Sequence, residues 1–333
     1  MKVYVLCPAA SVTGGPEALH QFVDAGQRLG FDMGMVYLPE EHADPTPEVY
    51  RFYAPRIARH IADAPDSLVV VPETGTLQLL ELRHARRAVW WLSVEHFLLR
   101  ADAMRQQGHK GPNPLDFVFD PRFGCLHLAQ SEYARAWAAQ RGAGEVLMLT
   151  DYVRDELLQR ARSVRGQAKE DIVAYNPKKG LEFTRRLMAA STDRPIRWVP
   201  IENMTPLQVA ELLGRAKVYV DFGPHPGRDR IPREAALCGA VVITGTQGSA
   251  GNPVDVPLPA GYKFDERHPL AVSGTLERID AVMADYAGHA QRFDAYRGWI
   301  ESQRDVFFDE VFTALAHAEA GMHDRASLQG VAA

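Results

Sequence analysis

Two loops that flank one short helix carry the side chains best suited to bind or transform a ligand. Residues 223–230 contain an imidazole, a carboxylate and several basic groups, and residues 245–252 contain small polar side chains. Apolar, β-branched runs at 218–220 and 240–244 precede the loops and are typical of strands in a parallel sheet covered on both faces. Because the loops then emerge at the carboxyl edge of the sheet, where open α/β sheets bind ligands, we expect a site there. Its candidate residues are His225, Arg228, Asp229, Gly248 and Ser249.

The segment between these loops predicts a short helix that positions Glu234. Pro232 suits the first turn of a helix, where a missing N–H group costs no hydrogen bond, and Gly239 can end the helix in the left-handed region. Glu234 then lies within one turn of the start of the helix.

Two other strand-to-helix turns carry groups that can face an anion. Gly14 and Gly15 precede a helix whose first turn contains Glu17, so free backbone N–H groups are expected there. Lys178 and Lys179 form a compact cation site beside a second helix N-terminus, which suits a diphosphate. The alternative for the glycines is that they are needed only for packing. The alternative for the lysines is that they lie on a solvated turn that binds no ligand.

A Glu-His pair lies at the end of another predicted strand, at residues 88–94. Ser93, Glu95 and His96 are expected at the carboxyl edge of the sheet to which that strand belongs. An imidazole at such an edge can act as a general base or contact an acceptor, so His96 is a catalytic candidate. A purely structural role for the pair is the alternative.

The helix between the two loops also carries a resemblance to a known family. Residues 232–244, PREAALCGAVVIT, resemble the donor-site signature of GT-B glycosyltransferases in the glycogen-synthase-like, family-four-type group. Members of that group use nucleotide sugars. The Glu of their signature hydrogen-bonds the nucleotide ribose, which implies this role for Glu234.

Two more segments match the same family. Gly14, Gly15 and Glu17 match its Gly-Gly-x-Glu loop, which meets the donor phosphate or sugar. Lys179, with the glycine that follows it, matches the Lys-Gly pair with which these enzymes neutralise the leaving diphosphate. Together with Glu234, the matches occur in the family's order and span nearly the whole chain.

The sequence departs from the family pattern at two points that concern the donor. Pro226 stands where many members have a second Glu that contacts the donor sugar. Sugar recognition is therefore expected to differ and to involve His225 or Asp229. The Arg that accompanies the family's Lys has no clean counterpart, which leaves the second positive charge to Lys178 or Arg233.

The resemblance implies an α/β fold of the GT-B class, in which two Rossmann-like domains face an interdomain cleft. We expect an acceptor-side domain at residues 1–160, a donor domain at 161–300, a helix at 301–320 that packs back on the first domain, and a tail at 321–333. The charged stretch at 154–169 is the expected linker.

Hydrophobic periodicity adds three local predictions. A helix is expected to contain Tyr50, Ile57 and Ile61, and a second helix is expected at residues 77–85. A short late strand is expected at 262–264.

The bulk composition indicates a soluble globular protein without a nucleic-acid partner. The chain has 333 residues, 46% of them hydrophobic and 24% charged, and its net charge of −5 argues against a broad basic face. No apolar run is long enough to span a bilayer, and the first residues lead into a strand rather than a signal peptide. Cys7, Cys125 and Cys238 lie far apart, which favours reduced thiols and a cytoplasmic location.

No metal site and no resident cofactor are expected. The sequence contains no Asp-x-Asp motif, which counts against the metal-dependent GT-A architecture. A peripheral contact with the inner face of the membrane is one interpretation of a segment in which basic side chains adjoin two tryptophans. The other is that the tryptophans fill a buried strand beside a solvated helix end. The segment contains Arg83, Arg86, Arg87, Trp90 and Trp91.

These features together predict a metal-independent glycosyltransferase of polysaccharide biosynthesis. It would move a hexosyl or related sugar from a nucleotide-diphosphate donor to a glycan or other hydroxyl acceptor. The resemblance implies retention of configuration, and the sequence itself leaves inversion open. One alternative is a GT-B-fold nucleotide-sugar epimerase that uses Glu73, Glu95 and His96. The other is a non-catalytic, transferase-like scaffold, which would bind a nucleotide without turning it over.

Overall fold

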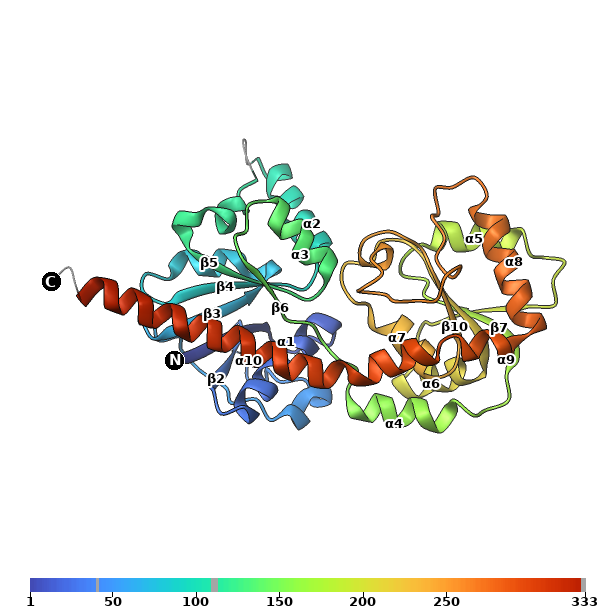
Figure 1. Ribbon diagram of the computed structural model, residues 1–333, viewed down its shortest axis with the longest axis horizontal. Coiled ribbons are helices and arrows are strands. Elements are labelled where there is room, and N and C mark those ends of the chain that lie inside the picture. Colours follow the sequence, from blue (N-terminus) through green and yellow to red (C-terminus); the bar gives the residue numbers. More distant parts are fainter. Residues whose placement is uncertain (40–41, 109–112, 331–333) are drawn as a thin grey trace. The chain divides into compact units, whose positions relative to one another are not determined.

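The computed structural model describes residues 1–39, 42–108 and 113–330, with side chains described up to Met322 (Figure 1). The chain forms two compact units, one of Met1–Asp151 with Asp305–Ala333 and the other of Tyr152–Arg304. Each unit contains a parallel sheet with helices on its faces. The predicted α/β class with two Rossmann-like domains is therefore confirmed.

The sheet of the first unit has six parallel strands in the order β2-β1-β3-β4-β5-β6. All six residues of β3 are buried, as expected for an inner strand covered on both faces. In chain order the strands are β1 (Lys2–Pro8), β2 (Asp32–Leu38), β3 (Ser67–Pro72), β4 (Arg86–Trp91), β5 (Cys125–Ala129) and β6 (Val146–Met148).

Helices cover both faces of this sheet, with α1 on one face and α2 and α3 on the other (Figure 1). Four short 3₁₀ segments complete the connections. The helical elements are α1 (Gly14–Arg28), η1 (Glu48–Tyr53), η2 (Glu73–Glu81), α2 (Val94–Gln106), η3 (Asp116–Phe119), η4 (Pro121–Phe123) and α3 (Glu132–Gln140).

Two predicted helices of the first unit are wrong in kind or extent. The segment at Tyr50 forms only η1, because Ala54 adopts a left-handed conformation and the chain then pairs with β2 through a bridge from Ile57 to Met35. The helix predicted at 77–85 is the 3₁₀ segment η2, which ends at Glu81. Beyond that point the Arg87 guanidinium donates to the Leu82 carbonyl oxygen.

Trp90 and Trp91 show how the two faces of this sheet are filled. Successive strand residues point to opposite faces. Trp90 accordingly packs edge-on against Phe22 of α1, and Trp91 against Phe97 of α2 and Trp137 of α3. Both tryptophan side chains are fully buried, so the membrane-contact interpretation of these two residues is wrong. No helix in the described part of the chain combines the length and the apolar character needed to cross a membrane.

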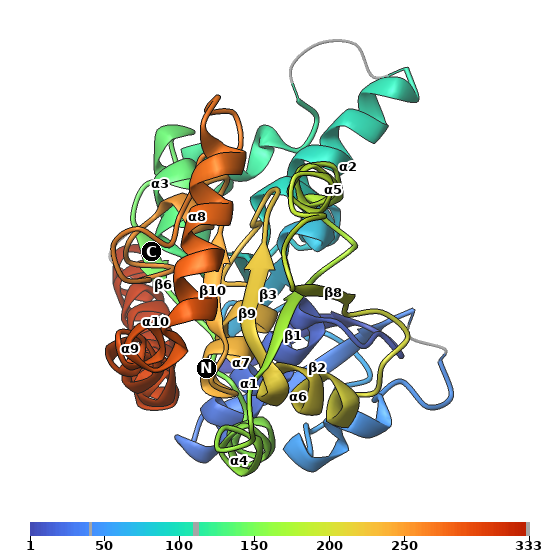
Figure 2. The same ribbon diagram turned by 90° about the vertical axis from the view of Figure 1, so that its right-hand side faces the viewer.

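The second unit contains a four-stranded parallel sheet in the order β10-β9-β7-β8. Helices α5 and α8 pack together on one face, and α4, α6 and α7 on the other (Figures 1 and 2). The strands are β7 (Glu170–Tyr175), β8 (Arg197–Pro200), β9 (Ala216–Asp221) and β10 (Val241–Thr244). The helices are α4 (Asp155–Val164), α5 (Leu181–Ala189), α6 (Pro206–Arg215), α7 (Arg230–Leu237), η5 (Ser249–Gly251), α8 (Ala271–Ala284) and α9 (Tyr286–Gln291).

Two further predictions need correction in the second unit. The stretch expected to be a linker forms α4, whose apolar side chains Leu157, Leu158 and Val164 are buried against this unit. Together with Ala161 they are four apolar positions at helical spacing, which is sufficient for packing although charged residues outnumber them over the stretch 154–169. The late strand is a single bridge from Lys263 to Thr244 rather than a strand.

The last helix, α10 (Asp294–Gly330), belongs to both units, since the first unit resumes at Asp305. Within the first unit, Glu310 Oε2 accepts hydrogen bonds of 2.7 Å from the backbone N and the Oγ1 of Thr150. The helix runs into the segment expected to be a tail. Residues 331–333 of that predicted tail lie outside the described residues.

The aromatic packing around Trp91 predicts a large stability difference between two residues of one helix. Phe97→Ala should lower the free energy of unfolding by about 3–5 kcal/mol, because it removes a fully buried ring and leaves a cavity. Leu99→Ala, in the same helix but 65% exposed, should change it by less than about 0.5 kcal/mol. Chemical unfolding followed by tryptophan fluorescence measures both, and equal effects would contradict the packing described.

Candidate functional site

The turn after β7 and the loop after β9 touch through their backbones. Gly180 has a φ of +59°, and a Cβ added there would lie 2.2 Å from the Phe222 carbonyl carbon. Gly223 has a φ of +86°, and a Cβ added there would lie 2.7 Å from the Gly180 nitrogen. Both positions therefore require glycine for conformation and for space. The contact places Lys179 beside the loop that follows β9.

Lys179 is held by two carboxylates of that loop region. Its Nζ lies 3.2 Å from Asp221 Oδ1 and also forms an ion pair with Asp229. Only 17% of the Lys179 side chain is exposed. Lys178 differs, because it is exposed and its backbone N donates to Asn176 Oδ1 at 3.0 Å. Of the two predicted lysines, Lys179 is thus the one fixed in the site.

His225 links the two predicted loops. Its backbone N donates to Gln247 O at 3.3 Å, and its O accepts from Ser249 N at 2.9 Å. A Cβ at Gly248, where φ is +63°, would lie 2.2 Å from His225 O, so glycine permits this approach. The imidazole is fully buried, and its Nε2 lies 3.7 Å from Asp229 Oδ2. The structure therefore brings together four predicted residues: Asp229, His225, Gly248 and Ser249.

Two acidic residues of this site were not among the predicted ones. Asp221 ends β9, and its pKa is raised by burial, an effect that Lys179 and His225 oppose. Its place at the end of an apolar run was a usable sequence signal. Glu266 accepts hydrogen bonds from Gly223 N at 2.7 Å and from Gln247 Nε2 at 3.1 Å, so it ties the two loops together. No local pattern marks Glu266.

Helix α7 forms as predicted, with Pro232 in its first turn and a left-handed Gly239, φ +92°, after its end. Glu234 is partly exposed and forms an ion pair of 2.9 Å with Arg230 one turn earlier. Arg233 is buried and donates to the carbonyl oxygens of Arg228 and Asp229. Arg233 therefore holds the preceding loop in place, while Glu234 is the carboxylate that lies near the surface.

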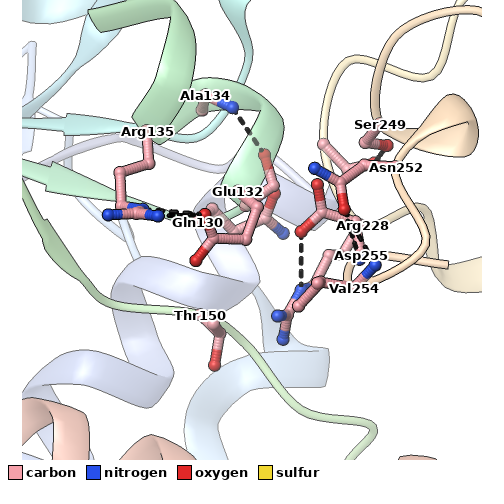
Figure 3. A network of polar contacts seen from close by, with 12 residues as sticks. Gln130, Glu132, Ala134, Arg135, Thr150, Arg228, Ser249, Asn252, Val254 and Asp255 are labelled. Carbon is pink, nitrogen blue, oxygen red and sulfur yellow. Dashed lines mark hydrogen bonds and ion pairs between the residues drawn. The ribbon is translucent and has the colours of Figure 1, made fainter. Parts of the chain in front are cut away.

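Arg228 is engaged by groups of its own unit. Figure 3 shows its guanidinium facing the carboxylate of Asp255, with Nε 3.5 Å from Oδ1. Nη1 donates to Gln303 Oε1 at 2.8 Å. Asn252 Oδ1 accepts from the backbone N of Asp255 at 3.4 Å, which fixes the turn that carries this carboxylate (Figure 3). These contacts make Arg228 a buried anchor of the loop.

In the first unit, the predicted glycine turn forms the start of α1. Gly14 is exposed, and a Cβ there would meet no atom within 4 Å, while one at Gly15 would make only an ordinary contact. Packing thus does not require glycine at either position. The first N–H groups of any α-helix lack intrahelical acceptors. Tyr50 fixes the turn by donating to Thr13 O at 3.0 Å, and Glu17 is buried in the first turn.

His96 lies in the first turn of α2, a helix that the sequence did not predict. Ser93 caps this helix by accepting a hydrogen bond from His96 N at 3.1 Å. The imidazole is 62% exposed, and its Nδ1 lies 3.9 Å from the buried Glu73 Oε1. Burial raises the pKa of Glu73 to about 7, although hydrogen bonds such as that from Leu92 N to Oε2 oppose the shift. Glu95 instead accepts a hydrogen bond of 2.8 Å from Tyr133.

Comparison with known proteins gives matches at the level of structure. No protein-family model and no curated protein matches the chain. Sucrose-phosphate synthase from Thermosynechococcus elongatus matches with a TM-score of 0.60 and 14% identity, over 98% of this chain and 100% of that one. S. aureus TarM, solved with fondaparinux, α-GlcNAc-glycerol and UDP, matches with a TM-score of 0.56 and 11% identity, over 76% of this chain. The match covers 56% of the TarM chain.

A third match broadens the range of ligands seen with this fold. An α-glucosyltransferase solved with UDP and a 13-mer DNA has a TM-score of 0.50 and 9% identity, over 94% of this chain and 95% of that one. These three likenesses show that the chain has the GT-B fold.

The backbone contact at Gly180 predicts that this position tolerates no side chain. Gly180→Ala should lower stability by more than the roughly 1–2 kcal/mol that a left-handed backbone costs other residues, because the new Cβ also collides with Phe222. Gly166→Ala is the control, since its Cβ would meet nothing within 4 Å. Thermal unfolding of both variants tests this, and similar melting temperatures would rule out the close approach.

Burial of Glu73 predicts a stability that falls as the pH rises. The folded-state pKa of about 7 exceeds the usual 4.5. Protonation of Glu73 therefore contributes fully to the free energy of unfolding below about pH 4.5, and this contribution is lost as the pH rises through 7. Between about pH 5 and pH 8, the wild type should lose roughly 3 kcal/mol relative to Glu73→Gln. Urea unfolding across this range gives the comparison. The exposed control Glu81→Gln should follow the wild type; parallel curves for wild type and Glu73→Gln would refute the assignment.

Proposed function

We propose that the protein is a glycosyltransferase that moves a sugar from a nucleotide-diphosphate donor to a hydroxyl acceptor. The observation that carries this proposal is the meeting of Lys179 with the loop before α7, at the carboxyl edge of the second sheet of a GT-B fold. Glu234 stands on α7, beside the same loop. These are the positions at which the family's diphosphate-binding Lys and ribose-binding Glu are expected.

The solved structures with this fold support the donor and acceptor classes. TarM was solved with UDP and saccharide ligands, and the α-glucosyltransferase with UDP and DNA. By analogy, we assign a nucleotide-diphosphate sugar as the donor and a glycan as the first acceptor to test. The earlier exclusion of nucleic acid is not supported, because a protein of the same fold binds DNA and net charge alone does not distinguish the two acceptors.

The chemistry that the second unit supplies is electrostatic. Negative charge develops on the departing diphosphate, and a preorganised ammonium beside helix α5 stabilises it more in the transition state than in the ground state. Lys179, which is paired with Asp221 and Asp229 in this structure, would supply this ammonium once it is released, and Lys178 is a second one at the same turn. The proposal includes transfer of a hexosyl group with retention of its anomeric configuration, which rests on the family resemblance. A retaining reaction can use the donor phosphate as base, which leaves His96 for acceptor contact.

A cytoplasmic location completes the proposal. All three cysteines are free thiols, with Cys7 and Cys238 buried. Burial raises the pKa of both thiols above the usual range, which keeps them in the unreactive protonated form. This agrees with a reducing compartment, in which nucleotide sugars are also available as substrates.

A nucleotide screen tests the donor assignment. One of UDP, GDP, CMP, ADP and dTDP should raise the melting temperature, because a ligand that binds only the folded state stabilises it by about 2.7 kcal/mol at a hundredfold excess over Kd. Glu234→Gln should abolish this shift. Glu211→Gln, an exposed carboxylate of α6 in the same unit, should retain it. Failure of every nucleotide to shift the wild type would overturn the assignment.

Turnover then separates the possible activities. The matching nucleotide sugar, incubated with glycan or DNA acceptors, should give a glycoside whose anomeric configuration is read by proton NMR. Conversion of the donor to an epimer without any acceptor would replace the proposal with an epimerase. Nucleotide binding without any conversion would replace it with a binding scaffold.

A further inference from the structure

Three side chains of the second unit direct ligand-type atoms toward one point. Asp221, His225 and Asp229 each contribute one carboxylate oxygen or imidazole nitrogen, and these atoms all lie within 4.8 Å of one another. The side chains of Asp221 and His225 are 1% and 0% exposed, and that of Asp229 is 23% exposed. Asp221 and His225 are thus cut off from water, which otherwise satisfies such groups.

The hydrogen bond on one side of His225 determines what the other side presents. Nδ1 lies 3.0 Å from Gly223 O, which can only accept, so Nδ1 carries a proton. In the neutral imidazole, Nε2 then directs a lone pair at Asp221 Oδ2, 3.8 Å away, and at Asp229 Oδ2, 3.7 Å away. Nε2 has no hydrogen-bond partner among the described residues. Three electron-rich atoms that converge in this way need a positive charge between them.

The surroundings of Asp221 point in the same direction. Tyr219 donates to Oδ2 at 2.9 Å, which orients the carboxylate, while Oδ1 lies 3.2 Å from the Lys179 ammonium. A histidine anchored through its second nitrogen to a carbonyl and a carboxylate anchored by a hydroxyl are the outer contacts that metal ligands typically have.

The charge present at this point is insufficient. Among the side chains that the structure describes, Lys179 is the cation that forms ion pairs with both carboxylates. With a neutral His225, two carboxylates and one ammonium leave one net negative charge in a largely buried group. Such a charge is costly unless it is compensated.

We propose that Asp221, His225 and Asp229 form a binding site for a divalent transition-metal ion, which competes with the Lys179 ammonium for the two carboxylates. One imidazole nitrogen with two carboxylate oxygens is a donor set that suits Zn²⁺, Co²⁺ and Mn²⁺ rather than Ca²⁺. The ion would balance both carboxylates and release Lys179. That the released ammonium then serves a donor diphosphate rests on the proposed function, but the metal site itself does not.

This site departs from the expectation that the protein holds no metal. That expectation relied on the missing Asp-x-Asp motif, which detects only carboxylates two residues apart. Here the ligands are four residues apart, at positions 221, 225 and 229. The last residue of β9 and its loop bring them together, which a search for the short motif misses.

Cobalt binding tests the proposal directly. The full chain, freed of metal by a chelator and dialysed, should bind one Co²⁺ with a visible d–d absorption band, and Zn²⁺ should displace it. Asp221→Asn and His225→Gln should each weaken binding at least tenfold, with folding checked by circular dichroism. Glu211→Gln, which removes an exposed carboxylate of α6 and no metal ligand, should bind Co²⁺ as the wild type does.

The variant Lys179→Met distinguishes a metal-binding site from a group of side chains that serves only to bind the Lys179 ammonium. Removing the competing ammonium should tighten Co²⁺ binding severalfold. This variant keeps the test valid even if Asp221→Asn does not fold. Absence of Co²⁺ binding in both the wild type and Lys179→Met would overturn the proposal. Undiminished binding in His225→Gln would also overturn it. Failure of the nucleotide screen would leave these results unaffected.

Discussion

The contact between the Gly180 backbone and residues Phe222 and Gly223 is the constraint on which the second unit's site depends. It requires two loops that follow different strands to approach without side chains between them. Only then can a lysine at one turn reach carboxylates on another. The bridge between His225 and Gly248 extends the same principle to the loop after β10. Three loops at one edge of the sheet thus become a single rigid surface, and the chemistry is added by the side chains that project from it.

Lys179 links the two proposals, because one ammonium cannot balance buried carboxylates and bind a diphosphate at the same time. In the structure it contacts Asp221 and Asp229. Moving it to a ligand would leave two negative groups close together in a region of low dielectric constant, where their repulsion is strong. Another positive charge has to arrive as the lysine leaves. A metal ion at the proposed site would provide that exchange, so the transferase and metal hypotheses are physically complementary.

The sequence predicted those features that depend on local chemistry. Apolar runs predicted β9 and β10, and a proline and a glycine predicted the bounds of α7. It did not predict α4, whose buried leucines are hidden in a charged stretch, or Glu266, whose partners Gly223 and Gln247 are remote in sequence. The buried state of Arg233 was likewise not predictable, because its acceptors are backbone carbonyls that carry no signature in the sequence. The local sequence thus predicts backbone conformation, whereas the fold determines which remote residues a side chain contacts.

The sharing of α10 between the two units has a consequence for how the chain acquires its structure during synthesis. The first unit consists of residues 1–151 and of the segment from 305 onward, with the whole second unit inserted between them. A ribosome therefore releases the material for the second unit while the first still lacks its closing helix. Contacts such as Glu310 with Thr150, and Glu319 with the amino terminus, join residues made before the second unit to residues made after it. The part of the protein that is made first is the last to be completed.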